Sequence, residues 1–188
     1  MNQQHIGTFD TPAYNKIFQT QLKELLTNYG EVGDVWFDGA HAPGCHGKPY
    51  DAELFDWLGH YRMIRTLQPG ATVSVVGPDI RWCGNEAGRS RGSEWSVLPI
   101  KDDLAKDPFK LLAFDKMEND LGSRDKLKDA RSLVWFPAQV NTSIRPGWFW
   151  RASQDDRVKS LDHLLNIYFG SVGGNGQFLL NLPLDARG

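Results

Sequence analysis

The chain has 188 residues, of which 40% are apolar and 23% are charged. These values are typical of a soluble globular domain with a core of its own. The formal net charge is −2 at pH 7, so electrostatics favours neither nucleic acid nor an anionic membrane surface as a partner. No apolar run is long enough to predict a transmembrane helix, and the first residues show no secretory signal.

The first predicted elements are a helix and a strand. Helical spacing of apolar residues covers residues 12–29, with Pro12 suited to the first turn and Gly30 to the C-terminal stop. A short strand then covers residues 34–38 and ends at Gly39. The same order repeats, with a second helix over residues 51–67 and a β-branched strand over residues 72–76.

The second half of the chain is less regular. Residues 79–101 are predicted to form a long loop, and residues 101–130 an irregular segment with some helix at 108–116. A third strand at 133–136, a third helix at 156–169 and a fourth strand at 178–182 follow.

Helices that alternate with short apolar strands predict an α/β fold of parallel β-α units. An open doubly wound sheet and a (β/α)8 barrel both fit this pattern. No glycine-rich phosphate loop follows a strand, which disfavours a nucleotide-dependent enzyme. The glycine-rich residues 173–176 precede a strand and are predicted to form a tight turn.

The chain has two cysteines, Cys45 and Cys83, too few for a disulfide framework. Cys45, His46 and the nearby His41 could be considered metal ligands, but a glycine-rich loop that happens to contain them is the favoured interpretation. We expect no metal.

Two carboxylates stand where parallel β-α folds concentrate their chemistry, after the carboxyl ends of strands. Asp38 ends the first strand, and Glu86 lies in the loop after the second. Two carboxylates that face each other across a pocket are what glycoside hydrolysis requires. Such a residue can also be a helix cap or an ion-pair partner, so the pattern alone leaves both interpretations open.

Tryptophan is abundant, with seven residues in the chain. Several lie next to the candidate carboxylates and other polar residues, where flat aromatic faces suit sugar rings. For any one of these tryptophans taken alone, filling the core is the favoured interpretation. The residues in question are Trp36, Trp82, Trp95 and Trp148.

Several segments in order resemble the α-L-fucosidases of glycoside hydrolase family 29. QLKELLTNYG at residues 21–30 and VWFDGA at 35–40 resemble the nucleophile region, and GPDIRWCGNEAG at 77–88 resembles the acid/base region. SIRPGWF at 143–149 and LLNLP at 179–183 are similar to later barrel segments. The residues in these segments resemble most the branch of the family that cleaves α-1,3- and α-1,4-linked fucose.

The resemblance implies a retaining mechanism with Asp38 as nucleophile and Glu86 as acid/base, without a cofactor. It also implies that Trp36, Arg81 and Trp148 contact the fucose of a fucosylated glycan. One departure concerns the Pro-Ala-Glu run of the family, which here reads Pro-Ala-Gln and ends at Gln139.

The length predicts one partial catalytic domain over residues 1–188, a truncated or half (β/α)8 barrel without a C-terminal β-sandwich, since a whole barrel needs about 250 residues. Unpaired strand edges and uncovered helix faces predict association with a second copy or with a missing half of the barrel. The alternative is a carbohydrate-binding module or remnant that does not turn over. The sequence leaves the cellular compartment open.

Overall fold

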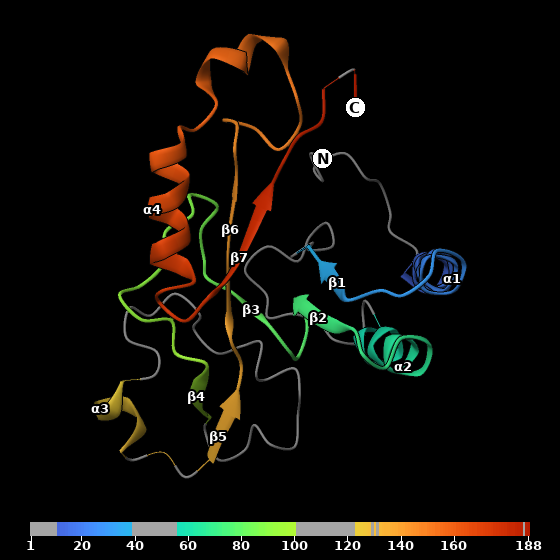
Figure 1. Cartoon of the computed structure of the whole chain (residues 1–188). Coiled ribbons are helices and arrows are strands. Elements are labelled where there is room, and N and C mark those ends of the chain that lie inside the picture. The colour runs from blue at the N-terminus through green and yellow to red at the C-terminus, as the bar shows by residue number, and fades with distance from the viewer. Residues whose placement is uncertain (1–10, 39–55, 101–122, 129, 131, 186) are drawn as a thin grey trace. The chain divides into compact units, whose positions relative to one another are not determined.

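The computed structural model describes residues 11–38, 56–100, 123–128, 130, 132–185 and 187–188 (Figure 1). The chain divides into two compact units, with the boundary between Pro78 and Asp79. Within the described ranges, no helix is long and apolar enough to cross a membrane.

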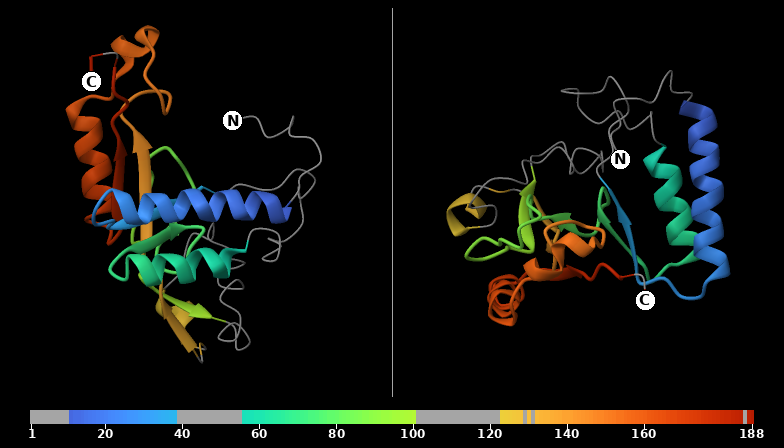
Figure 2. Two further views of the ribbon diagram at one scale, coloured as in Figure 1. Left: turned by 90° about the vertical axis from the view of Figure 1, so that its right-hand side faces the viewer. Right: turned by 90° about the horizontal axis from the view of Figure 1, so that it is seen from above.

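The first unit is a helix followed by a β-α-β unit. α1 (Thr11–Asn28) ends before Gly30, whose φ of 90° is the left-handed conformation that glycine favours after a helix. β1 (Asp34–Phe37) and β2 (Thr72–Val75) pair in parallel, and α2 (Trp57–Leu67) connects them. α1 and α2 lie side by side in both views of Figure 2. The predicted parallel β-α arrangement is confirmed in this unit.

An aromatic cluster forms the core between these elements. Phe37 of β1 is 6% exposed, and its ring centroid lies 5.3 Å from that of Trp57 on α2. The ring centroid of Phe18 on α1 lies 4.7 Å from that of the buried His60, with the two rings tilted by 46°. These contacts hold the last residue of β1 and therefore fix the point from which Asp38 leaves the strand.

The second unit contains a parallel three-stranded sheet in which β6 (Ala138–Ser143) lies between β3 (Arg81–Trp82) and β7 (Gln177–Asn181). A 3-10 helix (Ala152–Arg157) and α4 (Leu161–Ser171) connect β6 to β7. Here too the β-α-β order is parallel, as predicted.

A second, antiparallel pair completes this unit. It consists of β4 (Val97–Ile100) and β5 (Ser132–Trp135), and the short α3 (Arg124–Leu127) precedes β5. The strand predicted at 133–136 therefore exists, but it does not belong to the parallel set. The parallel neighbour of β7 is β6, which the sequence did not predict, and the predicted loop at 79–101 contains β3 and β4.

The helix bounds also differ from the prediction. α2 begins at Trp57 after Asp56, whose carboxylate accepts from the N–H of Gly59 at 3.2 Å. α4 begins only at Leu161 because Ser160 caps it through the N–H of His163 at 3.3 Å. Residues 51–55, the helix predicted at 108–116 and the residues considered as metal ligands (His41, Cys45 and His46) lie outside the described ranges.

Candidate active site

Asp38 directly follows β1 in the first unit, at the carboxyl end of the strand. Side chains alternate along a strand, so Phe37 enters the core while Trp36 and Asp38 share the opposite face. Trp36 is 37% exposed and Asp38 is exposed. This unit therefore presents an aromatic ring and a carboxylate together.

Glu86 lies in the second unit, on the loop after β3. The side chain of Asn85 folds this loop, because its Oδ1 accepts from the N–H groups of Ala87 and Arg89, each at 3.1 Å. Its Nδ2 donates to the carbonyl of Arg89 at 2.7 Å. Ala87 also forms an isolated antiparallel bridge with Thr142 on β6. The backbone around Glu86 is thus fixed while its side chain remains exposed.

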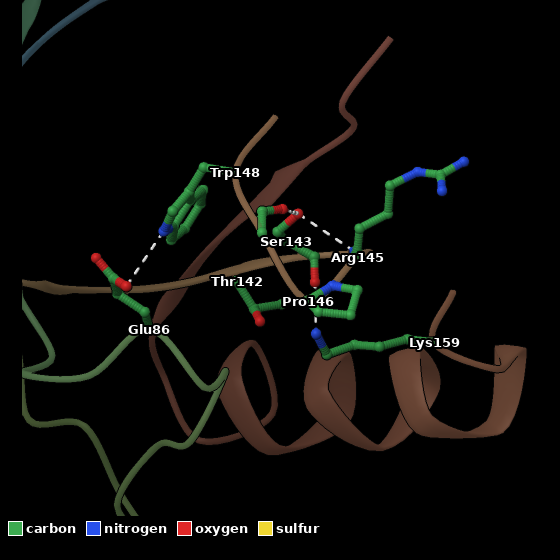
Figure 3. Close-up of a pocket in the computed structure, with 8 residues that line it drawn as sticks. Glu86, Thr142, Ser143, Arg145, Pro146, Trp148 and Lys159 are labelled. Atoms are coloured by element: carbon green, nitrogen blue, oxygen red, sulfur yellow. Dashed lines mark hydrogen bonds between the residues drawn. The ribbon is translucent and has the colours of Figure 1, made fainter. Parts of the chain in front are cut away.

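The carboxylate of Glu86 is held by Trp148. The indole Nε1–H donates to Oε2 at 3.1 Å, as Figure 3 shows. An indole N–H can only donate, so it can bond either the ionised or the neutral carboxyl group. The bond fixes one of the two carboxylate oxygens, Oε2. The structure therefore brings two of the sequence-predicted site residues into direct contact.

A pocket of about 110 Å³ opens beside this pair. Lys159 donates from Nζ to the carbonyl of Ser143 at 2.6 Å on one side of it. Thr142 is 1% exposed, and its Oγ1 has no hydrogen-bond partner within the described part of the chain. A buried hydroxyl without a partner offers a polar contact to a group in the pocket. The lining residues are Glu86, Thr142, Ser143, Arg145, Pro146, Gly147, Trp148 and Lys159.

Arg81 occupies a different kind of position. It is fully buried, with Nε donating to the carbonyl of Phe136 at 3.1 Å and Nη2 to that of Trp95 at 2.8 Å. Nη1 lies 3.2 Å from the buried carboxylate of Glu94, which also pairs with Arg91 at 3.0 Å. Burial lowers the pKa of Arg81, and the charge of Glu94 opposes this effect.

This position of Arg81 differs from the contact with fucose that the resemblance implied, because such a contact requires guanidinium atoms at a surface. In the structure the guanidinium joins the segment around Glu94 and Trp95 to Phe136, which lies between β5 and β6. A contact of Arg81 with fucose stays a prediction.

Gln139, where the sequence departs from the family pattern, is 1% exposed on β6. Its Nε2 donates to Oε1 of Gln177 on β7 at 2.9 Å. A carboxylate could not donate this bond. The amide of Gln139 therefore provides a hydrogen bond between β6 and β7 that a glutamate at this position could not donate.

The remaining chemistry-bearing residues in the described ranges do not form a metal site, since no three His, Cys, Asp or Glu residues there cluster suitably. Cys83 is a buried free thiol, and burial raises its pKa. A protonated buried thiol is a poor nucleophile.

Sequence reasoning did not assign roles to Thr142, Ser143, Lys159 or Asn181, which lie at or near the pocket. Two of them, Ser143 and Asn181, belong to the motifs at 143–149 and 179–183. Ser143 and Asn181 are each the polar last residue of a strand, and this position could have indicated a site residue. Only the pairing of β6 with β7 in the structure shows that the two motifs lie together.

No protein-family model matches the chain. The curated relative α-L-fucosidase 1 of Arabidopsis thaliana is 38% identical over 184 residues, which cover 95% of this chain and 32% of the relative. A crystal structure described as an α-L-fucosidase of Bacteroides ovatus ATCC 8483 matches with a TM-score of 0.80 and 47% identity, covering 95% of this chain and 31% of that one. A glycoside hydrolase 29 family member from an unknown rumen bacterium matches with a TM-score of 0.68 and 39% identity, covering 92% and 30%.

This chain is similar to a segment of the α-L-fucosidases. The resemblance drawn from the motifs is thus supported both in sequence and in fold. The chain spans about a third of the length of these α-L-fucosidases.

Proposed function

We propose that this chain carries the two catalytic carboxylates of a retaining α-L-fucosidase, with Asp38 as nucleophile and Glu86 as acid/base. The observation that carries the proposal is the presentation of Glu86, whose carboxylate is exposed and accepts a hydrogen bond from the Trp148 indole at Oε2. The strand-end position of Asp38 and the similarity to α-L-fucosidases support it.

In the first step, a carboxylate oxygen of Asp38 forms a bond to the anomeric carbon of fucose while the bond to the leaving oxygen breaks. Glu86 gives its proton to that oxygen. In the second step, Glu86 takes a proton from water, the water oxygen bonds to the anomeric carbon, and Asp38 leaves as a carboxylate. Retention requires the two carboxyl groups to stand about 5 Å apart. Proton transfer and carboxylate attack need no metal or organic cofactor.

The substrate we propose is a glycan with terminal α-L-fucose, in α-1,3 or α-1,4 linkage. The linkage rests on the resemblance of the quoted segments, taken together, to that branch of the family. Trp36 shares a strand face with Asp38 and is proposed to stack on the sugar, and the exposed part of Trp148 is proposed to pack against the C5 methyl group. We further propose that the two β-α-β units form part of a (β/α)8 barrel in one catalytic domain, completed by a second copy or by further chain.

Hydrolysis of nitrophenyl α-L-fucoside by the purified chain tests the proposal. The parent should hydrolyse it, and Asp38→Gly should lose at least about 10³-fold in kcat with an unchanged circular dichroism spectrum, because Asp38 is exposed and outside the core. Asp156→Gly, which removes a carboxylate that is 85% exposed and lies outside the proposed machinery, is the matched control. Hydrolysis by Asp38→Gly at the parental rate would remove Asp38 from the mechanism.

The second candidate is a carbohydrate-binding module that keeps the aromatic surface without turnover. The exposed rings of Trp36 and Trp148 favour it. Fucose binding by calorimetry together with no release of nitrophenol, in the parent and in Asp38→Gly alike, would select this function.

A further inference from the structure

Asn181, the last residue of β7, holds both ends of the loop that carries Trp148. Its Nδ2 donates to the carbonyl of Trp148 at 3.0 Å and to Oγ of Ser143 at 3.1 Å. A backbone carbonyl can only accept, so the amide nitrogen must face this loop. Both hydrogens of the amide are thereby used.

Ser143 closes the same loop from the end of β6. Its side chain is buried, its Oγ donates to the carbonyl of Gly147 at 2.8 Å, and it accepts from the N–H of Arg145 at 3.2 Å. The sheet fixes the pair, since Ser143 and Asn181 are partners in the parallel register and the N–H of Ile144 donates to the carbonyl of Asn181 at 3.1 Å.

These bonds form one continuous path to Glu86. Asn181 fixes the backbone at Trp148, and the Trp148 indole fixes Oε2 of Glu86. Both partners of Asn181, Ser143 and Trp148, line the pocket, whereas Asn181 itself is not among the lining residues.

We propose that Asn181 is a positioning residue for Glu86 that acts through the loop 143–148 and the Trp148 indole. The kinetic consequence rests on the proposed function of Glu86 as the acid/base. The structural consequence, that Asn181 sets the geometry of the Trp148–Glu86 bond, does not.

The structural consequence is tested by two-dimensional ¹H–¹⁵N spectra of the full chain with ¹⁵N-labelled tryptophan. Trp148→Phe assigns the indole resonance. Glu86→Ala should shift this resonance in the parent, because the acceptor is lost. In Asn181→Leu the resonance should already be shifted, and adding Glu86→Ala should change it by less than about a third of the parental shift, since coupled residues are non-additive.

Two further variants keep this test decisive. Asn166→Leu makes the same chemical change on the exposed face of α4 and should keep the full response to Glu86→Ala. Asn181→Asp keeps the shape of the side chain but removes both N–H donors, and should reduce the response even if Asn181→Leu fails to fold. A full response in Asn181→Leu, or in Asn181→Asp when Asn181→Leu is unfolded, would overturn the proposal.

The kinetic consequence is read from leaving-group dependence. A dinitrophenyl fucoside scarcely needs protonation to depart, whereas a fucosyl disaccharide does. Asn181→Leu should lower kcat/KM for the disaccharide by about 10- to 100-fold and for the dinitrophenyl fucoside by less than about threefold. Equal losses on both substrates would mean that Asn181 acts on folding alone. If Glu86→Ala itself shows no such selectivity, the proposed function of Glu86 fails, while the spectra still decide whether Asn181 positions it.

Discussion

Gly88 fixes the path of the loop that carries Glu86. It has a φ of 74°, in the left-handed region, and a Cβ at this position would lie 2.9 Å from side-chain atoms of the buried Ile167. Only glycine satisfies both the backbone conformation and the close approach to α4. The position of Glu86 therefore depends on Gly88, a residue without a side chain that could take part in the reaction.

Gly88→Ala is expected to lower the free energy of unfolding by about 1–3 kcal/mol, from the left-handed conformation and the contact with Ile167. Activity should fall as well, because the loop must shift. Urea denaturation measures the first effect. Gly92→Ala is the control, since a Cβ there meets no atom within 4 Å. Equal stability of the two variants would show that the loop tolerates a side chain at Gly88.

Sequence reasoning at the scale of single residues found the two exposed carboxylates, Asp38 and Glu86, but gave no sign that Arg81 is buried. Position after a strand indicates exposure for Asp38 and Glu86 because the chain leaves the sheet there. An arginine in a polar loop also suggests exposure, but Arg81 is buried by its pairing with Glu94, 13 residues further along. That pairing depends on a loop path that no local pattern reveals.

At the scale of elements, α1, β1 and α2 meet around His60. The imidazole is 1% exposed among the rings of Phe18, Phe37 and Trp57, and neither ring nitrogen has a hydrogen-bond partner in the described residues. Burial lowers the pKa of His60, against a smaller opposing effect of Asp56. The folded state therefore favours the neutral imidazole.

This predicts loss of stability in mild acid. The unfolded chain binds a proton at His60 once the pH falls below about 6.5, before the folded chain does. The contribution of the neutral His60 to the free energy of unfolding is complete above that pH. As the pH falls toward the lowered pKa of the folded state, this contribution decreases by up to about 1.4 kcal/mol per pH unit. His60→Phe keeps an aromatic ring and should remove this component between pH 7 and 5. Parallel stability–pH curves for parent and variant would contradict the assignment.

The strands show how far the sequence predicts the elements. β1, β2 and β7 were found because apolar and β-branched residues mark them. β5 also has an apolar sequence, yet Leu133 is 53% and Trp135 68% exposed in its antiparallel pairing with β4. β6 was not predicted because it carries polar residues although it is buried along its whole length. Hydrogen bonds from these residues to neighbouring strands and loops replace the bonds that they would form with water.

At the scale of the whole molecule, large apolar side chains remain exposed on and after α4 and β7. Leu161 and Phe169 on α4 and Leu182 and Leu184 after β7 are each more than half exposed. Large exposed apolar patches commonly mark surfaces that are covered in an assembly. They are consistent with the proposed association with a second copy or with further chain.

We therefore expect the purified chain to self-associate. Light scattering coupled to gel filtration should give a multiple of 21.2 kDa. Phe169→Glu should shift the equilibrium toward smaller species, whereas Asn166→Glu on the same helix should not. A monodisperse 21.2 kDa monomer with full fucosidase activity would contradict the expectation.

The chemistry is tested most directly by trapping the covalent intermediate with a 2-fluoro-substituted fucosyl fluoride, which forms the glycosyl-enzyme readily and hydrolyses slowly. Intact mass spectrometry should show one fluorofucosyl group per active chain, and peptide mapping should locate it on Asp38. Asp38→Gly should remain unlabelled. Labelling of another residue, or steady hydrolysis of fucosides without any adduct on Asp38, would contradict the account.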